Sequence, residues 1–263
     1  MRVAVFALIL MSCASAAFAQ QPFSTEEADV AQRSSAKFLI GTEFDALQPE
    51  DTDHDRQTTL LMRAGYGAAK NLEVEIAAPL VFLANTAEPN ARGYGDTSIS
   101  AKYQLRDDVR GPAVAVAFSV QIPTGDADRD IGSGVTMTWL NAIVGQKLSS
   151  KTNVSANVGF MPTGNPSVGA LGINARRGKI VTFGGVWNTE VTAKLKLGAE
   201  INGAATTTGD TAHQLHVLSG GNYELRRGLT MDAGVIVGHY TRTPRFGVLG
   251  GITVTVPASA AKE

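Results

Sequence analysis

Cysteine is almost absent from this chain, in which Cys13 is the only one among 263 residues. It falls in an N-terminal stretch that is typical of a secretory leader, with apolar residues from Val3 to Met11 and small residues up to Ala19. Cleavage after Ala19 leaves a mature chain without a disulfide, a thiolate nucleophile or a cysteine-built metal site. We therefore expect residues 1–19 to be a signal peptide.

A second interpretation keeps Cys13 in the mature protein. The preceding residues Leu10, Met11 and Ser12 loosely resemble the site at which a lipoprotein is cut and acylated, although Met11 fits this site poorly. We favour cleavage after Ala19 and leave lipidation at Cys13 as the alternative.

Net charge, aromatic residues and long hydrophobic runs are also scarce. The formal net charge is −1, which excludes a strongly basic surface for nucleic acid. Beyond the leader, the longest uncharged span is 131–146, and its glycines, threonines and asparagines do not resemble a transmembrane helix. Any part of the mature chain that spans a membrane must therefore do so with strands. The low aromatic content, 6%, is a mild argument against the aromatic girdles of outer-membrane barrels.

What the chain does contain is a repeated alternation. From Ala36 to Val256, about twelve short runs place apolar residues on one parity and polar or small residues on the other, as strands with two different faces do. In the run 113–122, the outward parity is Val114, Val116, Phe118, Val120 and Ile122, and the inward parity is Ala113, Ala115, Ala117, Ser119 and Gln121. In the run 134–148 the parity changes between Trp139 and Leu140, which predicts a bulge or a register change.

The connections between the runs alternate in length. The long ones are 45–56, 83–94, 123–133, 162–178 and 206–212, and the short ones are 69–71, 107–111, 149–152, 189–192 and 226–228. Short periplasmic turns and long outer loops are typical of outer-membrane barrels, whose even strand number places both termini in the periplasm. The connection 241–244 breaks the pattern, because it is short where a long loop is due.

The predicted fold is all-β, a transmembrane up-and-down antiparallel β-barrel of about 12 strands. We expect the barrel to occupy residues 36–256, after a short periplasmic N-terminal segment at 20–35 and before a C-terminal tail at 257–263. Outer-membrane lipids and lipopolysaccharide are its expected surroundings. The alternative is a soluble periplasmic β-sandwich or lipocalin-like barrel, which the pattern disfavours because charge and glycine occupy the parity that a soluble core would fill with apolar side chains.

Two motifs lie near the centre of the sequence. The first is Gly93, Tyr94, Gly95 and Asp96, and the second is Pro123, Thr124, Gly125 and Asp126. Spaced in this way over about residues 93–134, they resemble the outer-membrane transporters grouped as the MetA-pathway of phenol degradation family. The resemblance implies a barrel that passes small molecules, with aromatic ones as a candidate class. As residues alone, the motifs indicate strand boundaries, because glycine permits unusual backbone angles, aspartate caps turns and proline is tolerated at the rim of a sheet.

Ionisable residues of both signs fall on the inward parity. They are Lys37, Glu43, Arg63, Glu73, Glu75, Lys102, Arg106, Lys196, Glu200, His216, Glu224 and Asp232. A strongly ion-selective pore favours one sign, so this mixture predicts a narrow, weakly selective or largely plugged interior. The candidates for lumen-lining transport residues are Arg63, Glu73, Glu75, Lys102, Arg106, Lys196 and Glu200. The alternative is that these charges only pair with one another to stiffen the wall.

The sequence gives no pattern for a metal site, a cofactor or a catalytic centre. The acidic runs 51–55 and 126–130 have the spacing of a calcium loop but lack its central glycine and closing glutamate, so solvated loops are expected and divalent-cation binding stays open. Ser98 and Ser100 have no histidine nearby in sequence, and no nucleophile-elbow motif occurs.

The sequence therefore predicts a passive outer-membrane pore or transporter, not an enzyme. We expect a small-molecule permeant, hydrophobic or aromatic in character, and no energy coupling. Two rival hypotheses stay open: an outer-membrane enzyme that uses the barrel as a scaffold, and a soluble periplasmic β-barrel binding protein.

Overall fold

The computed structural model describes residues 22–47, 54–85, 90–163, 178–206, 214–239 and 244–258, and most of these residues form strands. The strands are β1 (Ala36–Ala46), β2 (Arg56–Ala69), β3 (Leu72–Ala84), β4 (Ala91–Tyr94), β5 (Thr97–Arg106), β6 (Ala113–Ile122), β7 (Met137–Lys147), β8 (Thr152–Thr163), β9 (Gly178–Glu190), β10 (Leu195–Thr206), β11 (Gln214–Arg226), β12 (Leu229–Gly238) and β13 (Phe246–Val256). Two short 3-10 turns, η1 (Asp108–Arg110) and η2 (Ala127–Arg129), lie in the connections. Neither of these described helices is long and apolar enough to cross a membrane.

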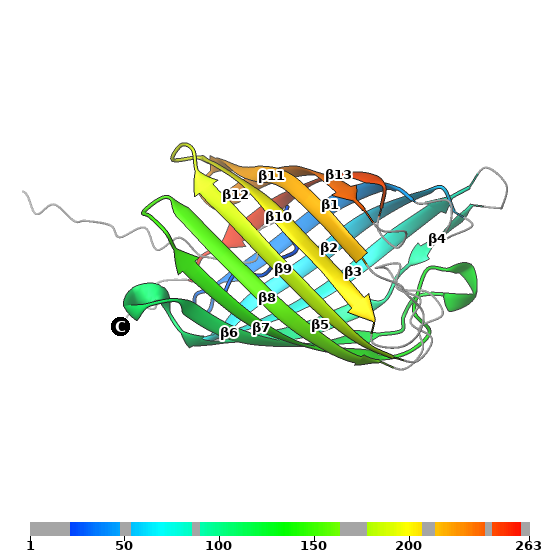
Figure 1. The fold of residues 1–263 in the computed structure, drawn as a ribbon, viewed down its shortest axis with the longest axis horizontal. Coiled ribbons are helices and arrows are strands. Elements are labelled where there is room, and N and C mark those ends of the chain that lie inside the picture. The colour runs from blue at the N-terminus through cyan, green and yellow to red at the C-terminus, as the bar shows by residue number, and fades with distance from the viewer. Residues whose placement is uncertain are drawn as a thin grey trace, which may run out of the picture.

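The sheet closes on itself (Figure 1). Neighbouring strands pair antiparallel around the whole ring, and β1 pairs with β13 from Ala36 opposite Val256 to Ala46 opposite Phe246. The short β4 and the longer β5 both pair with β3, so they are two parts of one wall strand. The thirteen strand segments thus make the 12-stranded antiparallel barrel that the sequence predicts.

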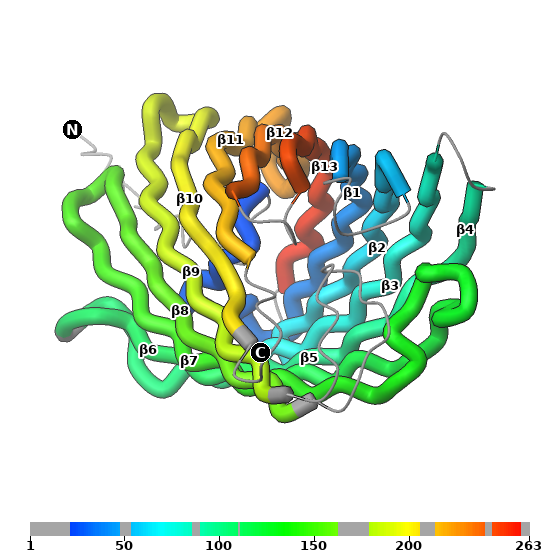
Figure 2. Tube along the Cα trace, turned by 45° about the vertical axis from the view of Figure 1, so that its right-hand side comes forward, coloured from blue at the N-terminus to red at the C-terminus, as the bar shows by residue number. Residues whose placement is uncertain are grey.

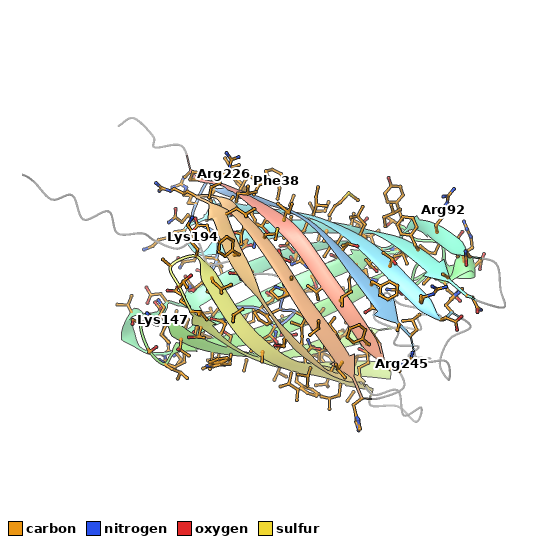
Figure 3. The ribbon with its side chains drawn as sticks, turned by 90° about the horizontal axis from the view of Figure 1, so that it is seen from above. Phe38, Arg92, Lys147, Lys194, Arg226 and Arg245 are labelled. Carbon is orange, nitrogen blue, oxygen red and sulfur yellow. The ribbon has the colours of Figure 1, made fainter. Side chains whose placement is uncertain are left out.

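The outside of the wall is apolar, whereas the inside combines polar and small residues with a few apolar clusters. On β6, for example, Phe118 is 48% exposed on the outer face, whereas Ala115 and Ala117 on the inner face are buried. Basic side chains gather at the two rims, with Arg92 and Arg245 at one end and Lys147, Lys194 and Arg226 at the other (Figure 3). An apolar band between charged rims is the surface that a bilayer requires, and water would disfavour it. This surface therefore argues against the soluble-barrel alternative.

The predicted irregularity in β7 is wrong. Pairing of β7 with β6 and with β8 runs without a register shift, and Leu140 lies outside while Trp139 and Asn141 lie on the inner face. The apparent change of parity arises because Met137 and Trp139 are apolar residues on the lumen side. They pack there with Met161 of β8 and Ile180 of β9.

The two ends of the barrel carry different connections. One end has the turns between β2 and β3, β5 and β6, β7 and β8, β9 and β10, and β11 and β12, and the other has the longer loops. The connection between β12 and β13 covers residues 239–245. This connection is longer than the predicted range 241–244, because β12 ends earlier and β13 begins later than expected. The alternation of short and long connections therefore has no exception here.

Candidate functional site

Charged side chains of the inner wall pair across neighbouring strands. Lys102 Nζ on β5 lies 3.8 Å from Glu73 Oε2 on β3, and both side chains are almost fully buried. On the adjacent strands β2 and β3, Arg63 Nε lies 3.3 Å from Glu75 Oε1. Four of the predicted lumen residues thus form two ion pairs, which offsets part of the cost of removing their charges from water.

The other three predicted lumen residues lie apart from this cluster. Glu200 on β10 is 2% exposed, and its Oε1 accepts a hydrogen bond from Asn202 Nδ2. Lys196 lies on the same inner face of β10 near the short-turn end and is half-buried. Arg106 is exposed at the short-turn rim, where its Nε donates to the Pro112 carbonyl oxygen at 2.7 Å.

A segment that the sequence placed before the barrel lies inside it. The backbone from Pro22 to Ser35 crosses the lumen before β1 begins, and Figure 2 shows it as the blue trace within the ring of strands. We call residues 22–35 the inner segment. Phe23 packs against Val186, Leu218 and Ile236, which belong to β9, β11 and β12.

The middle of the inner segment touches the opposite wall. Ala28 packs against the small inward residues of β6, which are Ala113, Ala115 and Ala117. The segment therefore spans the lumen from one side of the barrel to the other.

Buried wall carboxylates hold the inner segment by its backbone. Thr25 N–H donates to Glu200 Oε2 at 2.6 Å, and Ala31 N–H donates to Glu73 Oε2 at 3.0 Å. Lys102 Nζ donates to the Glu27 carbonyl oxygen at 3.2 Å. Hydrogen bonds to charged groups are stronger than neutral ones, so these contacts fix the path of the segment.

The inner segment also presents its own carboxylates to amides of the wall. Asn188 Nδ2 donates to Glu27 Oε1 at 2.9 Å, and Asn141 Nδ2 donates to Glu26 Oε1 at 3.5 Å. Gln104 Nε2 donates to Asp29 Oδ1 at 3.1 Å. The inward asparagines and glutamine were not among the predicted site residues. Two features of the sequence could have indicated them. They lie on the inward parity of their strands, and the inner segment, which shows no strand alternation, contains acidic residues that need partners.

Glycines of the wall leave room for the segment. A Cβ on Gly67 would lie 1.9 Å from the Gln32 carbonyl oxygen, and a Cβ on Gly198 would lie 2.8 Å from Phe23 Cζ. Real Cβ atoms do not approach other atoms so closely, so position 67 requires glycine for as long as the segment is in place. Position 198 requires it in any case, because its Cβ would also lie 2.5 Å from the Trp187 carbonyl oxygen of the wall.

Asp29 of the inner segment lies in an environment that disfavours its charged form. Burial, with a smaller contribution from the neighbouring Glu27 charge, raises the pKa of the Asp29 carboxyl above its ordinary value. The charged form of Asp29 therefore weakens the docking of the segment, and the neutral form does not.

The two sequence motifs meet near the long-loop end of the barrel. Asp96 Oδ1 accepts a hydrogen bond from Gly125 N–H at 3.0 Å, and Thr124 Oγ1 donates to the Gly95 carbonyl oxygen at 2.9 Å. Asp126 caps the short turn η2 by accepting from Asp128 N–H. Pro123 begins the connection after β6, and Gly93 lies on the inner face of β4. Within the described residues, no group of three or more histidine, cysteine, aspartate or glutamate side chains is arranged to hold a metal ion; residues 51–53 of the first acidic run lie outside them.

The family model described as "Putative MetA-pathway of phenol degradation" matches residues 28–256. The chain belongs to this family. The match begins within the inner segment, at residue 28, and ends with β13. None of the curated proteins matches the chain.

Solved outer-membrane proteins share the fold. The crystal structure of the COG4313 outer membrane channel from Pseudomonas putida F1 has a TM-score of 0.64 at 12% identity, over 86% of this chain and 97% of that one. The NanC porin has a TM-score of 0.56 at 8% identity, over 83% and 98%. The KdgM porin has a TM-score of 0.50 at 10% identity, over 84% and 98%. At these identities the likeness shows the fold, an outer-membrane β-barrel.

The contact at Gly67 predicts how the inner segment can be displaced. Gly67→Ala forces a Cβ against the segment backbone, and overpacking of this kind costs about 1–3 kcal/mol, so we expect the buried Thr25→Cys reporter to react with a water-soluble thiol reagent about tenfold faster or more. Gly65→Ala is the matched control, because its Cβ would meet Glu73 Oε1 at an ordinary 3.5 Å. Equal labelling rates in the two variants would contradict the docked position of the segment.

The raised pKa of Asp29 predicts that pH controls the docking of the segment. The docked state binds the Asp29 proton more tightly, so docking is strongest below the ordinary pKa of 3.8 and weakens as the pH rises through the raised value. Labelling of Thr25→Cys should therefore accelerate with rising pH, after correction for the reactivity of a free thiol. Asp29→Asn should remove this added acceleration, and an unchanged profile in that variant would show that Asp29 is not the group responsible.

Proposed function

We propose that this protein is an outer-membrane pore or uptake channel for small solutes, hydrophobic or aromatic ones in particular. The observation that carries the proposal is a closed barrel whose inner face holds paired charges, amides and a crossing segment. The wall alone does not require such an interior, because a transmembrane barrel that serves only as an anchor can fill its lumen with side chains.

The inner wall supports small and apolar permeants more than ions. Four of the lumen charges form two opposite-sign pairs, so an ion would meet compensated charge at this part of the wall. Apolar groups also reach the lumen, because Met137, Met161 and Ile180 form a cluster on the inner face, with Trp139 packed against it. The family name, which refers to phenol degradation, points to aromatic molecules.

The inner segment limits the passage of solutes through the lumen. It crosses the barrel in the half near the short turns, and it is held by Glu73, Glu200 and Lys102. We propose that these residues act in transport by positioning the segment. Arg63 and Glu75 complete the charged wall beside them, while Lys196 and Arg106 line the end of the path at the short-turn rim.

We further propose that the chain reaches the outer membrane after cleavage of residues 1–19 at Ala19, with outer-membrane lipid and lipopolysaccharide around its wall. Residues 20–35 then form the start of the mature protein and residues 257–263 its tail. A transport role is favoured over catalysis, because Glu73, Glu200 and Lys102 bind the inner segment and Arg63 pairs with Glu75.

Conductance in a planar lipid bilayer tests the proposal. The purified full chain should form a channel of low conductance that phenol reduces, and deletion of residues 22–32 should raise the conductance about threefold or more, since a 12-stranded barrel encloses an open lumen once the segment is removed. Gly185→Ala, which alters an outward position with no atom closer than 4.0 Å to the new Cβ, is the control and should match the parent. A folded deletion variant that conducts no better than the parent would refute the assigned role of the lumen.

A further inference from the structure

The wall strand formed by β4 and β5 is interrupted at a defined place. Pro79 of β3 lies opposite the interruption, and a proline has no N–H to give to a neighbouring strand. Its carbonyl oxygen accepts from Gly95 N–H at 2.9 Å, but a Cβ on Gly95 would lie 2.9 Å from Pro79 Cγ. Glycine is therefore needed beside the proline, and the strand resumes only at Thr97.

Asp96, at this interruption, binds the connection that follows β6. Its side chain is buried, and its two carboxylate oxygens accept three hydrogen bonds. Gly125 N–H donates to Oδ1 at 3.0 Å, while Ser133 N–H and Gln121 Nε2 donate to Oδ2 at 2.7 and 2.9 Å. One carboxylate thus joins the end of β6 to both ends of the loop 125–133.

The loop fits closely around this carboxylate. A Cβ on Gly132 would lie 2.7 Å from Asp96 Oδ1, and a Cβ on Gly125 would lie 2.7 Å from the Ile131 carbonyl oxygen. The buried Ser133 side chain closes the turn by donating to the Val135 carbonyl oxygen at 2.8 Å. These glycines are the ones at which the backbone of the loop folds back onto itself.

The loop takes the place of wall strand at the long-loop mouth. The last pair joining β5 and β6 is Thr97 with Ile122, whereas β4 continues beyond that level and pairs only with β3 among the described strands. Ile131 packs against Val81, Leu83 and Ala91 on the inner face of β3 and β4.

The other end of the loop reaches the opposite side of this gap. Val135 packs against the apolar cluster formed by Met137 of β7, Met161 and Ile180. His54 Nε2, in the connection before β2, lies 3.5 Å from Asp130 Oδ2, which ties the loop to a neighbouring connection. Side-chain contacts, rather than a ladder of backbone hydrogen bonds, therefore hold this part of the entrance.

We propose that Asp96 is a positioning residue that folds the loop 123–136 against the inner wall and thereby sets the width of the entrance to the lumen. The proposal rests on the proposed function in one respect, which is that the long-loop mouth is the entrance for solutes. The two glycines of the first motif and the glycine of the second serve the same arrangement, because they make room for Pro79, Ile131 and the Asp96 carboxylate.

Asp96→Asn tests the positioning role. An asparagine offers only one acceptor oxygen. Its amide NH₂ group would face an N–H group that now donates a hydrogen bond to the carboxylate, so that hydrogen bond would be lost. In the full chain on intact cells, the buried reporter Ser133→Cys should react with a membrane-impermeant maleimide about tenfold faster or more once Asp96 is replaced, as expected for loss of a hydrogen bond to a charged group. The exposed Asp128→Asn in the same loop is the control and should leave the rate unchanged.

A second reporter tests the width of the entrance. Ser119→Cys lies on the lumen face of β6 below the loop, so a maleimide with a long polyethylene glycol chain should reach it poorly in the parent and readily after Asp96→Asn. Migration of the unheated protein on a gel shows whether each variant is folded. If Asp96→Asn does not fold, Gly132→Ala disturbs the same contact from the loop side and should give the same two increases.

Unchanged rates at Ser133→Cys in a folded variant would overturn the positioning role. Faster labelling there without access of the long reagent to Ser119→Cys would overturn the assignment of the loop to the entrance. Neither reporter depends on solute passage, so a protein that conducts nothing in a bilayer would refute the proposed function while these labelling results still decide the role of Asp96.

Discussion

Closure of the hydrogen-bonded wall is the constraint on which the rest of this structure depends. An unpaired backbone N–H or C=O group facing hydrocarbon costs several kcal/mol, so a sheet in a membrane cannot keep a free edge. Pairing of β1 with β13 removes the two edges that the chain would otherwise have. Once the ring is closed, each strand has one face toward lipid and one toward an enclosed space, and the alternation of apolar and polar residues follows.

The enclosed space then creates a second requirement. Carboxylates and ammonium groups on the inner face are removed from bulk water and need partners. Lys102 and Arg63 provide partners within the wall, and the inner segment provides others, because its backbone N–H groups meet Glu73 and Glu200. The segment and the polar lumen are therefore one arrangement, in which each stabilises the buried groups of the other. Under the proposed function, a permeant would have to compete with these contacts.

The sequence predicts the wall well because alternation is a local property. The parity of Phe118 against Ala117 can be read from neighbouring residues, and the family resemblance rested on motifs that lie within about 40 residues of one another. The orientation of Trp139 cannot be read from the sequence, because an apolar residue in a lumen has the same local pattern as one that faces lipid. The inner segment shows no alternation, and contacts such as Thr25 with Glu200 join residues 175 positions apart, which no local pattern can reveal. The role of Asp96 was hidden for the same reason, since its partners Gly125 and Ser133 belong to a different connection.

Cross-linking at the seam of the ring tests the closed wall most directly. Ile40 on β1 lies opposite Ile252 on β13, both toward lipid, and Cys13 is the only other cysteine in the chain. Cysteines at positions 40 and 252 should form an intramolecular disulfide on mild oxidation of outer membranes, whereas cysteines at 40 and 254 should do so far more slowly. Absence of the first cross-link, or equal formation of both, would contradict the closed barrel and the enclosed lumen that follows from it.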